Sequence, residues 1–570
     1  MSEPTDAAST QLATLADEFW DRLAEAQPLN STARGDRRFD DRIDDITPEA
    51  VGRERRRLEA VAAAARGIPE TGLSAADRVT RGALIEEAAG SAELIGLGLE
   101  AWTVDPLEGW HIQIQSVASY QPVATPDQAR AMVRRWHTFG RQLDRVTQNL
   151  QRGLADDRVA VRTPVTKVIA ALTDTLATPD AESPFLVPLR ETHDDWSQSD
   201  RSAFAEGLTS ALHDEIRPAL ARYRELLARD VLPRSRPDET PGLIALPGGE
   251  GAYRTLVRYH TTLDVSPGTL HETGLAEVAR INAETEALGR RALGAANRPD
   301  TLRRLREDPA MHFATREEVA GAATTALARA LAATPDWFGR LPATPCVVVP
   351  MPAHEEEHST IAYYREAAVD GSRPGEYYIN TSHPETRPRY EAECLAYHEA
   401  VPGHHLQIAL AQEMRDLPAF RRHLGPTAFF EGWGLYTERL ADGMGLYSGD
   451  VDRLGMLSMD AWRACRLVVD TGIHALGWTR QQAIDYMIAN TALAPNNIAN
   501  EVDRYIVWPG QALAYKAGQL EMLRLRAEAQ ETLRDRFDVR SFHDAVLGNG
   551  AIALGTLGTV VRQWVAERRH

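Results

Sequence analysis

The residues best suited to chemistry lie in one short stretch of the chain, residues 397–407, with the sequence YHEAVPGHHLQ. It contains three imidazoles, those of His398, His404 and His405, and the carboxylate of Glu399. Imidazole nitrogens and carboxylate oxygens are the usual ligands of catalytic zinc, which takes three protein ligands and leaves a fourth position for water. The stretch therefore predicts a zinc site with a neighbouring carboxylate that can act as a base.

A glutamate further along the chain completes the candidate site. Glu431 lies in the segment FEGWGLY, which we expect to be helical, and Glu438 lies two turns further along the same predicted helix. The pairing with the histidines resembles zinc peptidases in which a downstream glutamate is the third ligand. We take Glu431 as that ligand, and Glu438 is the alternative.

The spacing of the histidines differs from that of an ordinary H-E-x-x-H helix, because Pro402 occupies the position of the second histidine. On an ideal helix His404 would be rotated by about 240° from His398, whereas His405 would face the same way but lie about 10 Å further along the axis. A proline removes a helical hydrogen bond, and the glycine after it tolerates unusual dihedral angles. We therefore expect the helix to break at Val401–Gly403, with a new turn that presents His404.

The same residues resemble the signature of a bacterial family called domain of unknown function 885, through the pattern His398-Glu399-x-x-Pro402-Gly403-His404-His405-x-Gln407. That family is similar in fold to the mainly helical zinc carboxypeptidases of the thermostable Taq type and, more distantly, to thimet oligopeptidase and angiotensin-converting enzyme. In those relatives a glycine precedes the second ligand histidine, which favours His404 over His405. The resemblance covers most of the chain and is densest over residues 375–525.

The resemblance also implies catalytic roles. With one zinc ion per chain on the three ligands, the pKa of a bound water falls toward about 7. Glu399 would take the proton of this water and later pass it to the leaving amine. In the related peptidases a tyrosine or histidine on a late helix donates a hydrogen bond to the developing oxyanion. Tyr505 and Tyr515 are the candidates for that role by analogy.

Basic residues late in the chain are candidates for substrate binding. Arg463 and His474 lie on the polar stripe of an otherwise apolar predicted helix, where they either belong to an ion-pair network or meet a substrate carboxylate. Arg504 and Lys516 flank a helix break at a Pro-Gly pair and could bind a terminal carboxylate. His405, if it is not the second ligand, is a further candidate for substrate binding.

Two short β-type runs precede the predicted metal helix, residues 346–351 and 375–380, and predict a small sheet beside it. In the zinc-peptidase plan an edge strand pairs with an extended peptide, so Tyr377 in the second run is a candidate substrate contact. The alternative is a structural hairpin. A third run, residues 107–115, also alternates with some strand character.

The rest of the sequence predicts helices. A segment with three prolines, residues 232–242, divides the chain into an N-terminal helical half, residues 1–235, and a metal-site half, residues 243–570. We expect the halves to form one compact unit. The fold class is then mainly α, a large helical shell with a deep cleft near residues 398–438 and a small β-sheet next to the metal helix, as in zinc carboxypeptidases.

Composition narrows the function classes. A net charge of −18 argues against nucleic acid or an anionic membrane as the partner. Three cysteines, Cys346, Cys394 and Cys465, indicate a reducing compartment. The first residues lack the pattern of a secretory signal, and no apolar run is long enough to span a membrane. We expect a cytoplasmic protein whose oligomeric state is open, with a homodimer among the candidates.

These observations together predict a zinc-dependent metallopeptidase that cleaves short peptides, as a carboxypeptidase or a dipeptidase. One alternative is a zinc hydrolase of a non-peptide amide or another small metabolite. The other is a non-catalytic binding protein that uses the histidines structurally. The presence of Glu399 beside His398 favours an enzyme, because a structural metal site needs no free base.

Overall fold

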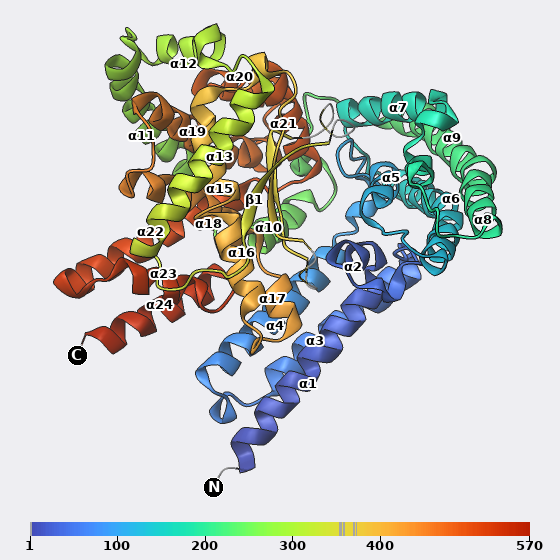
Figure 1. Ribbon diagram of the computed structural model, residues 1–570, viewed down its shortest axis with the longest axis horizontal. Coiled ribbons are helices and arrows are strands. Elements are labelled where there is room, and N and C mark those ends of the chain that lie inside the picture. The colour runs from blue at the N-terminus through green and yellow to red at the C-terminus, as the bar shows by residue number, and fades with distance from the viewer. Residues whose placement is uncertain (1–2, 353–355, 357–359, 369–370, 372, 570) are drawn as a thin grey trace. The chain divides into compact units, whose positions relative to one another are not determined.

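The structure, a computed structural model, describes residues 3–352, 356, 360–368, 371 and 373–569. It consists mainly of helices with one small sheet (Figure 1), which confirms the predicted mainly α class. None of the helices in these residues combines the length and the apolar character that a membrane span requires.

Helices occur along the whole length of the chain. The first nine are α1 Glu3–Ala26, α2 Pro28–Arg34, α3 Pro48–Gly67, α4 Ala75–Gly96, α5 Trp110–Tyr120, α6 Pro126–Ala155, α7 Arg162–Ala177, α8 Gln198–Ser210 and α9 Arg217–Leu226. The next are α10 Gly249–Thr261, α11 Pro267–Leu293, α12 Arg298–Glu307, α13 Arg316–Ala333, α15 Ala392–Glu399, α16 His404–Glu413, α17 Ala419–His423 and α18 Thr427–Gly443. The last are α19 Asp450–Leu476, α20 Arg480–Asn490, α21 Pro495–Val507, α22 Leu513–Leu533, α23 Val539–Leu547 and α24 Leu554–Arg568.

The chain forms two compact units, each of which contains separate segments of the sequence. The first comprises Met1–Ala16, Ala64–Glu87 and Glu250–His570, and the second comprises Asp17–Ala63 and Ala88–Gly249. Every residue that the sequence singles out for chemistry belongs to the first unit.

The second unit has its own apolar core, to which α6 contributes Trp136, Phe139 and Leu143. The helix begins after Thr125, whose side chain accepts a hydrogen bond from the backbone N–H of Gln128 in a capping box. The core also includes Leu220 of α9, which packs along α6. This unit therefore buries apolar side chains of its own around α6.

Residues 107–115, for which the sequence indicates strand character, are instead the approach to α5 and its first turns. The buried residues of this helix are His111, Ile114 and Val117, three positions apart, which is the spacing of one helix face. The strand interpretation was wrong because Ile114 is buried together with His111 and Val117 at helical spacing, whereas Ile112, two positions away, is only partly buried.

The buried side chain of Arg236 stabilises the proline-rich segment between residues 232 and 242 through hydrogen bonds. The Arg236 guanidinium donates hydrogen bonds to the backbone carbonyls of Val159, Pro241 and Gly242, at 3.0, 2.6 and 2.5 Å. The segment is thus held against the rest of the second unit.

The sheet has three strands in the order β1-β3-β2, with bounds β1 Cys346–Pro350, β2 Ala362–Arg365 and β3 Gly375–Ile379. β1 runs parallel and β2 antiparallel to β3. Both predicted strands are confirmed, and β2 is a strand that the sequence analysis did not predict. The edge role suggested for residues 375–380 is wrong, because β3 is the central strand and its hydrogen-bonding sides are taken by β1 and β2.

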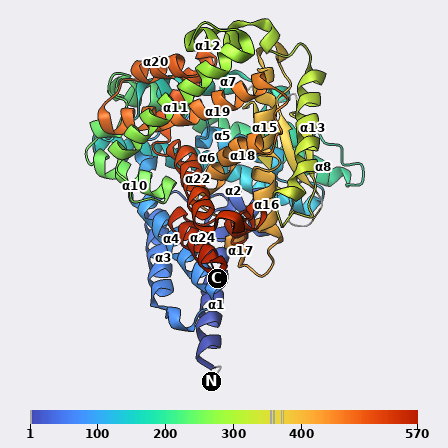
Figure 2. The same cartoon turned by 90° about the vertical axis from the view of Figure 1, so that its left-hand side faces the viewer.

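Helix α19 is the central support of the site. It packs along α11 over much of its length (Figure 2) and also contacts α15, α18, α20, α21 and α22. Nearly all of its residues from Leu454 to His474 are buried, polar ones included. A helix enclosed in this way can hold charged side chains only if they have partners or face a cavity.

Candidate metal centre

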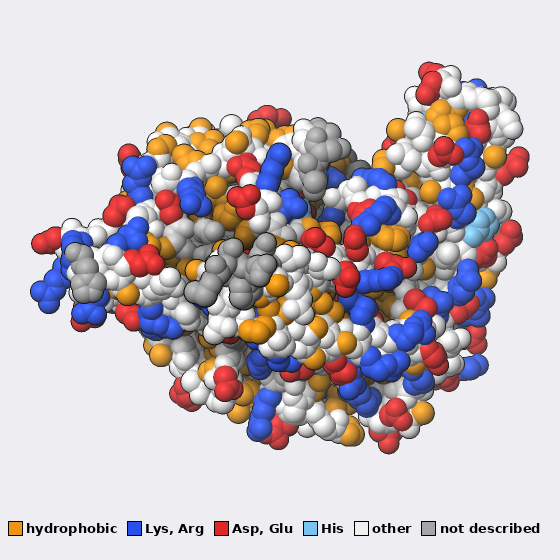
Figure 3. Space-filling model, turned by 90° about the horizontal axis from the view of Figure 1, so that it is seen from below, with side chains coloured by type: hydrophobic (Ala, Val, Ile, Leu, Met, Phe, Trp, Pro, Cys, Tyr) orange, Lys and Arg blue, Asp and Glu red, His pale blue; other side chains and the backbone are white. Residues whose placement is uncertain are grey.

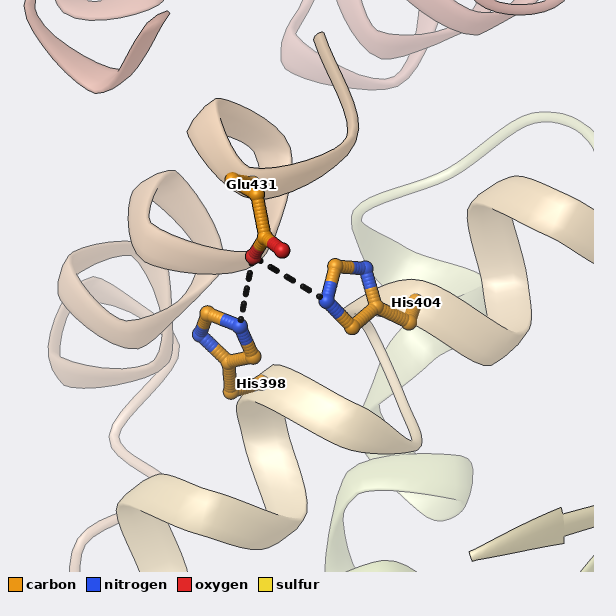
Figure 4. A group of neighbouring side chains, drawn as sticks. All are labelled: His398, His404 and Glu431. Carbon is orange, nitrogen blue, oxygen red and sulfur yellow. Dashed lines mark ion pairs between the residues drawn. The ribbon is translucent and has the colours of Figure 1, made fainter. Parts of the chain in front are cut away.

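The structure brings together one side chain from each of three helices: His398 of α15, His404 of α16 and Glu431 of α18 (Figure 4). Glu431 Oε2 lies 3.6 Å from Nε2 of each histidine. One ligand atom of each residue lies within 4.8 Å of the other two. The two imidazole rings meet edge to face, with their centroids 4.7 Å apart. The three atoms converge on one point, as the ligands of a single ion must.

The predicted helix break creates this arrangement. Helix α15 ends at Glu399 and α16 begins at His404, so the break at Val401–Gly403 is confirmed. Trp433 of α18 donates a hydrogen bond from Nε1 to the carbonyl oxygen of Pro402 at 2.9 Å. The intervening turn changes the chain direction and brings His404 back toward His398, which a continuous helix could not do.

Close packing of α18 on α15 depends on a glycine. A Cβ atom at Gly434 would lie 2.7 Å from His398 Nε2, closer than side chains normally approach. Thr437 of α18 also donates a hydrogen bond to the carbonyl oxygen of Tyr397 at 3.1 Å. The glycine after Trp433 in the FEGWGLY segment therefore lets Glu431 reach the histidines.

Glu438 orients His398 rather than joining the three-residue group. Its Oε1 lies 2.7 Å from His398 Nδ1, on the opposite side of the ring from Glu431. A carboxylate that accepts the Nδ1 hydrogen fixes the tautomer in which Nε2 is free to bind a metal. Of the two glutamates that the sequence left open, the structure groups Glu431 with the histidines and places Glu438 behind one of them.

The two neighbouring histidines have different surroundings. His404 has Nε2 toward Glu431, and its buried Nδ1 has no hydrogen-bond partner within the described residues. His405 has Nδ1 3.0 Å from the Tyr364 hydroxyl and Nε2 3.1 Å from the Thr344 carbonyl oxygen. Both nitrogens of His405 are therefore engaged, and burial lowers its pKa to about 4. His404 is the histidine that the structure places in the group.

The group attracts positive charge. Burial disfavours the charged form of His398, but hydrogen bonds to Glu431 and Glu438 outweigh it and raise the His398 pKa to about 9. Burial likewise acts against the Glu431 anion, yet His398 and His404 hold the Glu431 pKa well below its usual range. Two imidazole nitrogens and one carboxylate oxygen, with one imidazole oriented by a buried carboxylate, fit the donor set of a catalytic zinc site.

One face of the group opens into a cavity of about 810 Å³ in the first unit. Its wall contains all three residues of the group together with Glu399. Of the other residues that the sequence singled out, Arg463, Arg504 and Tyr515 also line it. The structure therefore brings these seven residues to one cavity.

The remaining predicted site residues lie outside the cavity wall. The Tyr505 hydroxyl donates a hydrogen bond to Glu501 at 2.9 Å, and His474 Nε2 lies 2.9 Å from the Tyr505 carbonyl oxygen. Lys516 is fully buried beside Asp460. Tyr377 is also fully buried. Burial raises the pKa of Tyr377 well above its usual value, and the negative charge of Glu399 raises it further.

The sequence analysis did not single out two residues of the cavity wall, Arg466 and Glu501. Each lies three positions from a residue that it did single out, Arg463 in one case and Arg504 in the other. Residues three apart share a helix face, so this spacing was the available signal.

Comparisons with known proteins give a family and two similar structures. A family described as "Bacterial protein of unknown function (DUF885)" matches residues 28–561. A crystal structure of a candidate lipoprotein from Colwellia psychrerythraea is 28% identical, with a TM-score of 0.91 over 98% of this chain and 99% of that chain. A structure of a candidate lipoprotein of unknown function from Shewanella oneidensis is 16% identical, with a TM-score of 0.75 over 97% and 99%. No curated protein matches the chain.

Proposed function

The chain belongs to the bacterial family DUF885, whose function is unknown, and we propose that it is a zinc-dependent hydrolase of short peptides. The observation that supports this proposal is the convergence of His398, His404 and Glu431 in the wall of a cavity that also contains Glu399. Structural zinc sites are usually closed by four protein ligands, whereas catalytic sites use three and leave a position for water. A three-residue group that faces a cavity matches the catalytic type.

The proposed chemistry is hydrolysis of an amide bond. A zinc ion held by His398, His404 and Glu431 would supply Lewis-acid chemistry, lowering the pKa of water and polarising a carbonyl group. The chain's own residues supply the proton transfers and the binding. The Glu399 carboxylate lines the same cavity, where it can accept a proton from water and give it to the leaving amine. The Tyr515 hydroxyl, also in the wall, can donate a hydrogen bond to the substrate carbonyl oxygen.

The size and the wall of the cavity favour a short extended substrate. Its volume of about 810 Å³ lies within the range of sites for small molecules, roughly 300–1,000 Å³. Ala362, Tyr363 and Tyr364 of β2, an edge strand of the sheet, are part of the wall. An edge strand can pair with the backbone of an extended peptide. This role, which the sequence analysis gave to β3, therefore passes to β2 in the proposal.

Several predictions from the sequence stay predictions. The likeness to the zinc carboxypeptidase fold, the identity of the metal and the absence of nucleic-acid or membrane partners belong to this group. The cytoplasmic location is also still a prediction. Both similar structures are described as candidate lipoproteins, a description that favours a membrane-anchored location instead. Fractionation of the native bacterium, with detection of the protein in each fraction, decides between the two.

The proposal is tested by separating turnover from metal binding. We expect the zinc-loaded wild type to hydrolyse one or more members of a panel of short peptides and N-acyl amino acids. Glu399→Gln should keep its zinc and lose about 10²–10⁴-fold in turnover, because the general base is gone. Glu385→Gln is the matched control, since that glutamate is exposed and outside the cavity.

Full activity of Glu399→Gln would refute the role of Glu399. Zinc-loaded wild type that hydrolyses no member of the panel would refute the proposed function. Activity on N-acyl amino acids alone would favour the non-peptide amide alternative.

A further inference from the structure

We propose that Arg463, Arg466 and Arg504 form a carboxylate-binding subsite in the cavity, so that the substrate carries a free carboxylate close to the bond that is cleaved. This inference deepens the proposed function and rests on it for the reaction, although the binding site itself can be tested without turnover. Four observations carry it.

The first observation is a buried guanidinium group without a close anionic partner. Arg463 is only 5% exposed, and its Nη1 donates to the sulfur of Met459 at 3.1 Å. Its Nε has no hydrogen-bond partner among the described residues. The nearest carboxylate oxygen of the described residues, Oε1 of Glu438, is 3.9 Å from Nη2 and already accepts a hydrogen bond from His398. A buried charge in this state is unfavourable unless an anion binds to it.

The second observation is that the other two arginines share one carboxylate. Glu501 Oε2 lies 3.0 Å from Arg466 Nη2 and 3.2 Å from Arg504 Nη2. Arg466 Nη1 and Arg504 Nε are buried and have no hydrogen-bond partner in the described part of the chain. In the described residues, the carboxylates within ion-pair distance of the three guanidinium groups are those of Glu501 and Glu438, and Glu438 also pairs with His398. The three guanidinium groups of the subsite therefore carry more positive charge than the nearby carboxylates neutralise.

The third observation is the aromatic surface that holds the guanidinium groups. The Trp462 ring centre is 4.3 Å from the guanidinium carbon of Arg463 and 4.4 Å from that of Arg466. The Tyr515 ring centre is 4.3 Å from that of Arg466. Aromatic faces attract guanidinium groups and leave their edges free to donate. A planar fork held in this way suits a carboxylate, which it can bind with two parallel hydrogen bonds.

The fourth observation is the contrast between the cavity and the protein as a whole. The chain has a net charge of −18, and on the face drawn in Figure 3 acidic and basic side chains are interspersed. The described wall of the cavity contains seven arginines and five glutamates, without lysine or aspartate. Two of those glutamates, Glu399 and Glu431, belong to the proposed catalytic centre. An acidic protein with a cavity rich in arginine attracts an anion to that cavity.

The position of the subsite indicates which bond is cleaved. Glu438 contacts both His398, at 2.7 Å, and Arg463, at 3.9 Å, so a single side chain separates the subsite from the metal centre. Tyr515, whose ring centre is 4.3 Å from the guanidinium carbon of Arg466, lines the same cavity wall as Glu431. A carboxylate bound by the arginines therefore places an amide bond near its own end of the peptide at the metal centre.

The reaction that follows is release of one or two residues from the C-terminus. One water molecule is added across the C–N bond: its oxygen becomes one of the two oxygens of the new carboxylate of the shortened peptide, and both of its protons end on the amine of the released fragment, which leaves as an ammonium group. The substrate class is accordingly a short peptide with a free C-terminal carboxylate.

Binding of trialanine and of its C-terminal amide, measured by calorimetry on the full-length Glu399→Gln variant, tests the subsite. The amide removes only the negative charge. We expect the acid to bind about 30-fold more tightly or better, since loss of one member of a buried charge pair has an effect of at least that size. Arg463→Gln should reduce this preference at least tenfold, and Arg463→Lys should keep part of it. Arg453→Gln is the matched control, because Arg453 lies on the same helix but outside the cavity wall.

Each result has a distinct meaning. Equal binding of acid and amide to the parent protein would overturn the subsite, and so would an undiminished acid preference in both Arg463→Gln and Arg504→Gln. If Arg463→Gln does not fold, as judged by circular dichroism, Arg463→Lys and Arg504→Gln carry the same comparison. Acid preference in a protein that hydrolyses no peptide would support the subsite and refute the proposed function. Equal hydrolysis of acid and amide by the wild type would support the function and overturn the subsite.

Discussion

Two clusters of buried charge lie three residues apart on helix α19, and they are built differently. In the first, Asp460 accepts hydrogen bonds from Lys516 at 2.7 Å and from Arg439 at 2.6 Å. Lys516 also lies 2.9 Å from Glu277, and Arg439 donates to Glu284 at 2.7 Å. Every charge in this first cluster has a close partner of opposite sign.

The second cluster begins one turn further along with Arg463 and contains the arginines of the proposed subsite. In the part of the chain that the structure describes, its three cations have one carboxylate within 3.2 Å, that of Glu501, and a second, that of Glu438, at 3.9 Å; the three arginines and Glu501 line the cavity. The first cluster contributes no residue to the cavity wall. Paired charges on a buried helix face thus have a structural role. Charges beside a cavity that lack enough partners of opposite sign indicate a ligand-binding site.

Substituting a charged residue of the first cluster should have the largest effect, a loss of folding stability. Lys516→Met leaves the buried Asp460 and the half-buried Glu277 with fewer partners, and we expect it to lower the free energy of unfolding by about 3–5 kcal/mol. Urea denaturation of the variant and the wild type measures the difference. A loss below about 1 kcal/mol would show that the first cluster is not a tightly coupled structural network.

A second difference on the same helix concerns pH. Burial raises the pKa of Asp470 to about 7, although hydrogen bonds from the Tyr253 hydroxyl and the Gly510 N–H partly oppose it. Burial acts the same way on Asp460, but there Lys516 and Arg439 outweigh it and hold the pKa well below its usual range. The folded protein thus keeps a proton on Asp470 between about pH 4 and 7, where the unfolded chain releases it.

The sign of the pH effect follows from that difference. A group whose pKa is raised by folding stabilises the protein below its unfolded pKa, and this contribution is lost as pH rises through the folded value. Asp470 should make the free energy of unfolding fall between about pH 4 and 7, by up to about 1.4 kcal/mol per pH unit. Asp470→Asn should remove this slope, as measured by urea denaturation across the range. An unchanged slope in the variant would contradict the raised pKa.

The smallest effect is expected for the second cluster. Because the nearest carboxylate to Arg463 among the described residues, that of Glu438, is 3.9 Å away and already pairs with His398, Arg463→Gln should change the free energy of unfolding by less than about 1 kcal/mol, while it removes the preference for a carboxylate ligand. The same urea denaturation, run beside Lys516→Met, gives the comparison directly. A loss of unfolding free energy as large as that of Lys516→Met would show that Arg463 has a structural role, and the two clusters would then not differ in function.

Local sequence signals predicted the elements well. The break at Val401–Gly403 follows from the chemistry of proline and glycine, and both β-type runs are strands of one sheet. The choice of His404 and Glu431 agrees with the group that the structure forms. These signals depend on a few neighbouring residues, which is why the sequence carries them.

What the sequence could not show is which face of a buried helix meets the cavity. Arg463 and Lys516 are both basic residues on apolar helices, yet only Arg463 lines the cavity, since the partners of Lys516 come from distant parts of the chain. The strand β2 was not predicted because its four residues are too few to show a clear strand pattern. The central position of β3 depends on pairing with β2 and could not be read from its own residues.

The zinc content of the purified protein, measured by elemental mass spectrometry, tests whether His398, His404 and Glu431 bind a metal ion. We expect about one zinc per chain in the wild type, and none in His398→Ala. His383→Ala, at an exposed histidine outside the cavity, should keep the metal. No zinc in the wild type after incubation with zinc, or full zinc in His398→Ala, would contradict the assignment of His398, His404 and Glu431 as a metal centre.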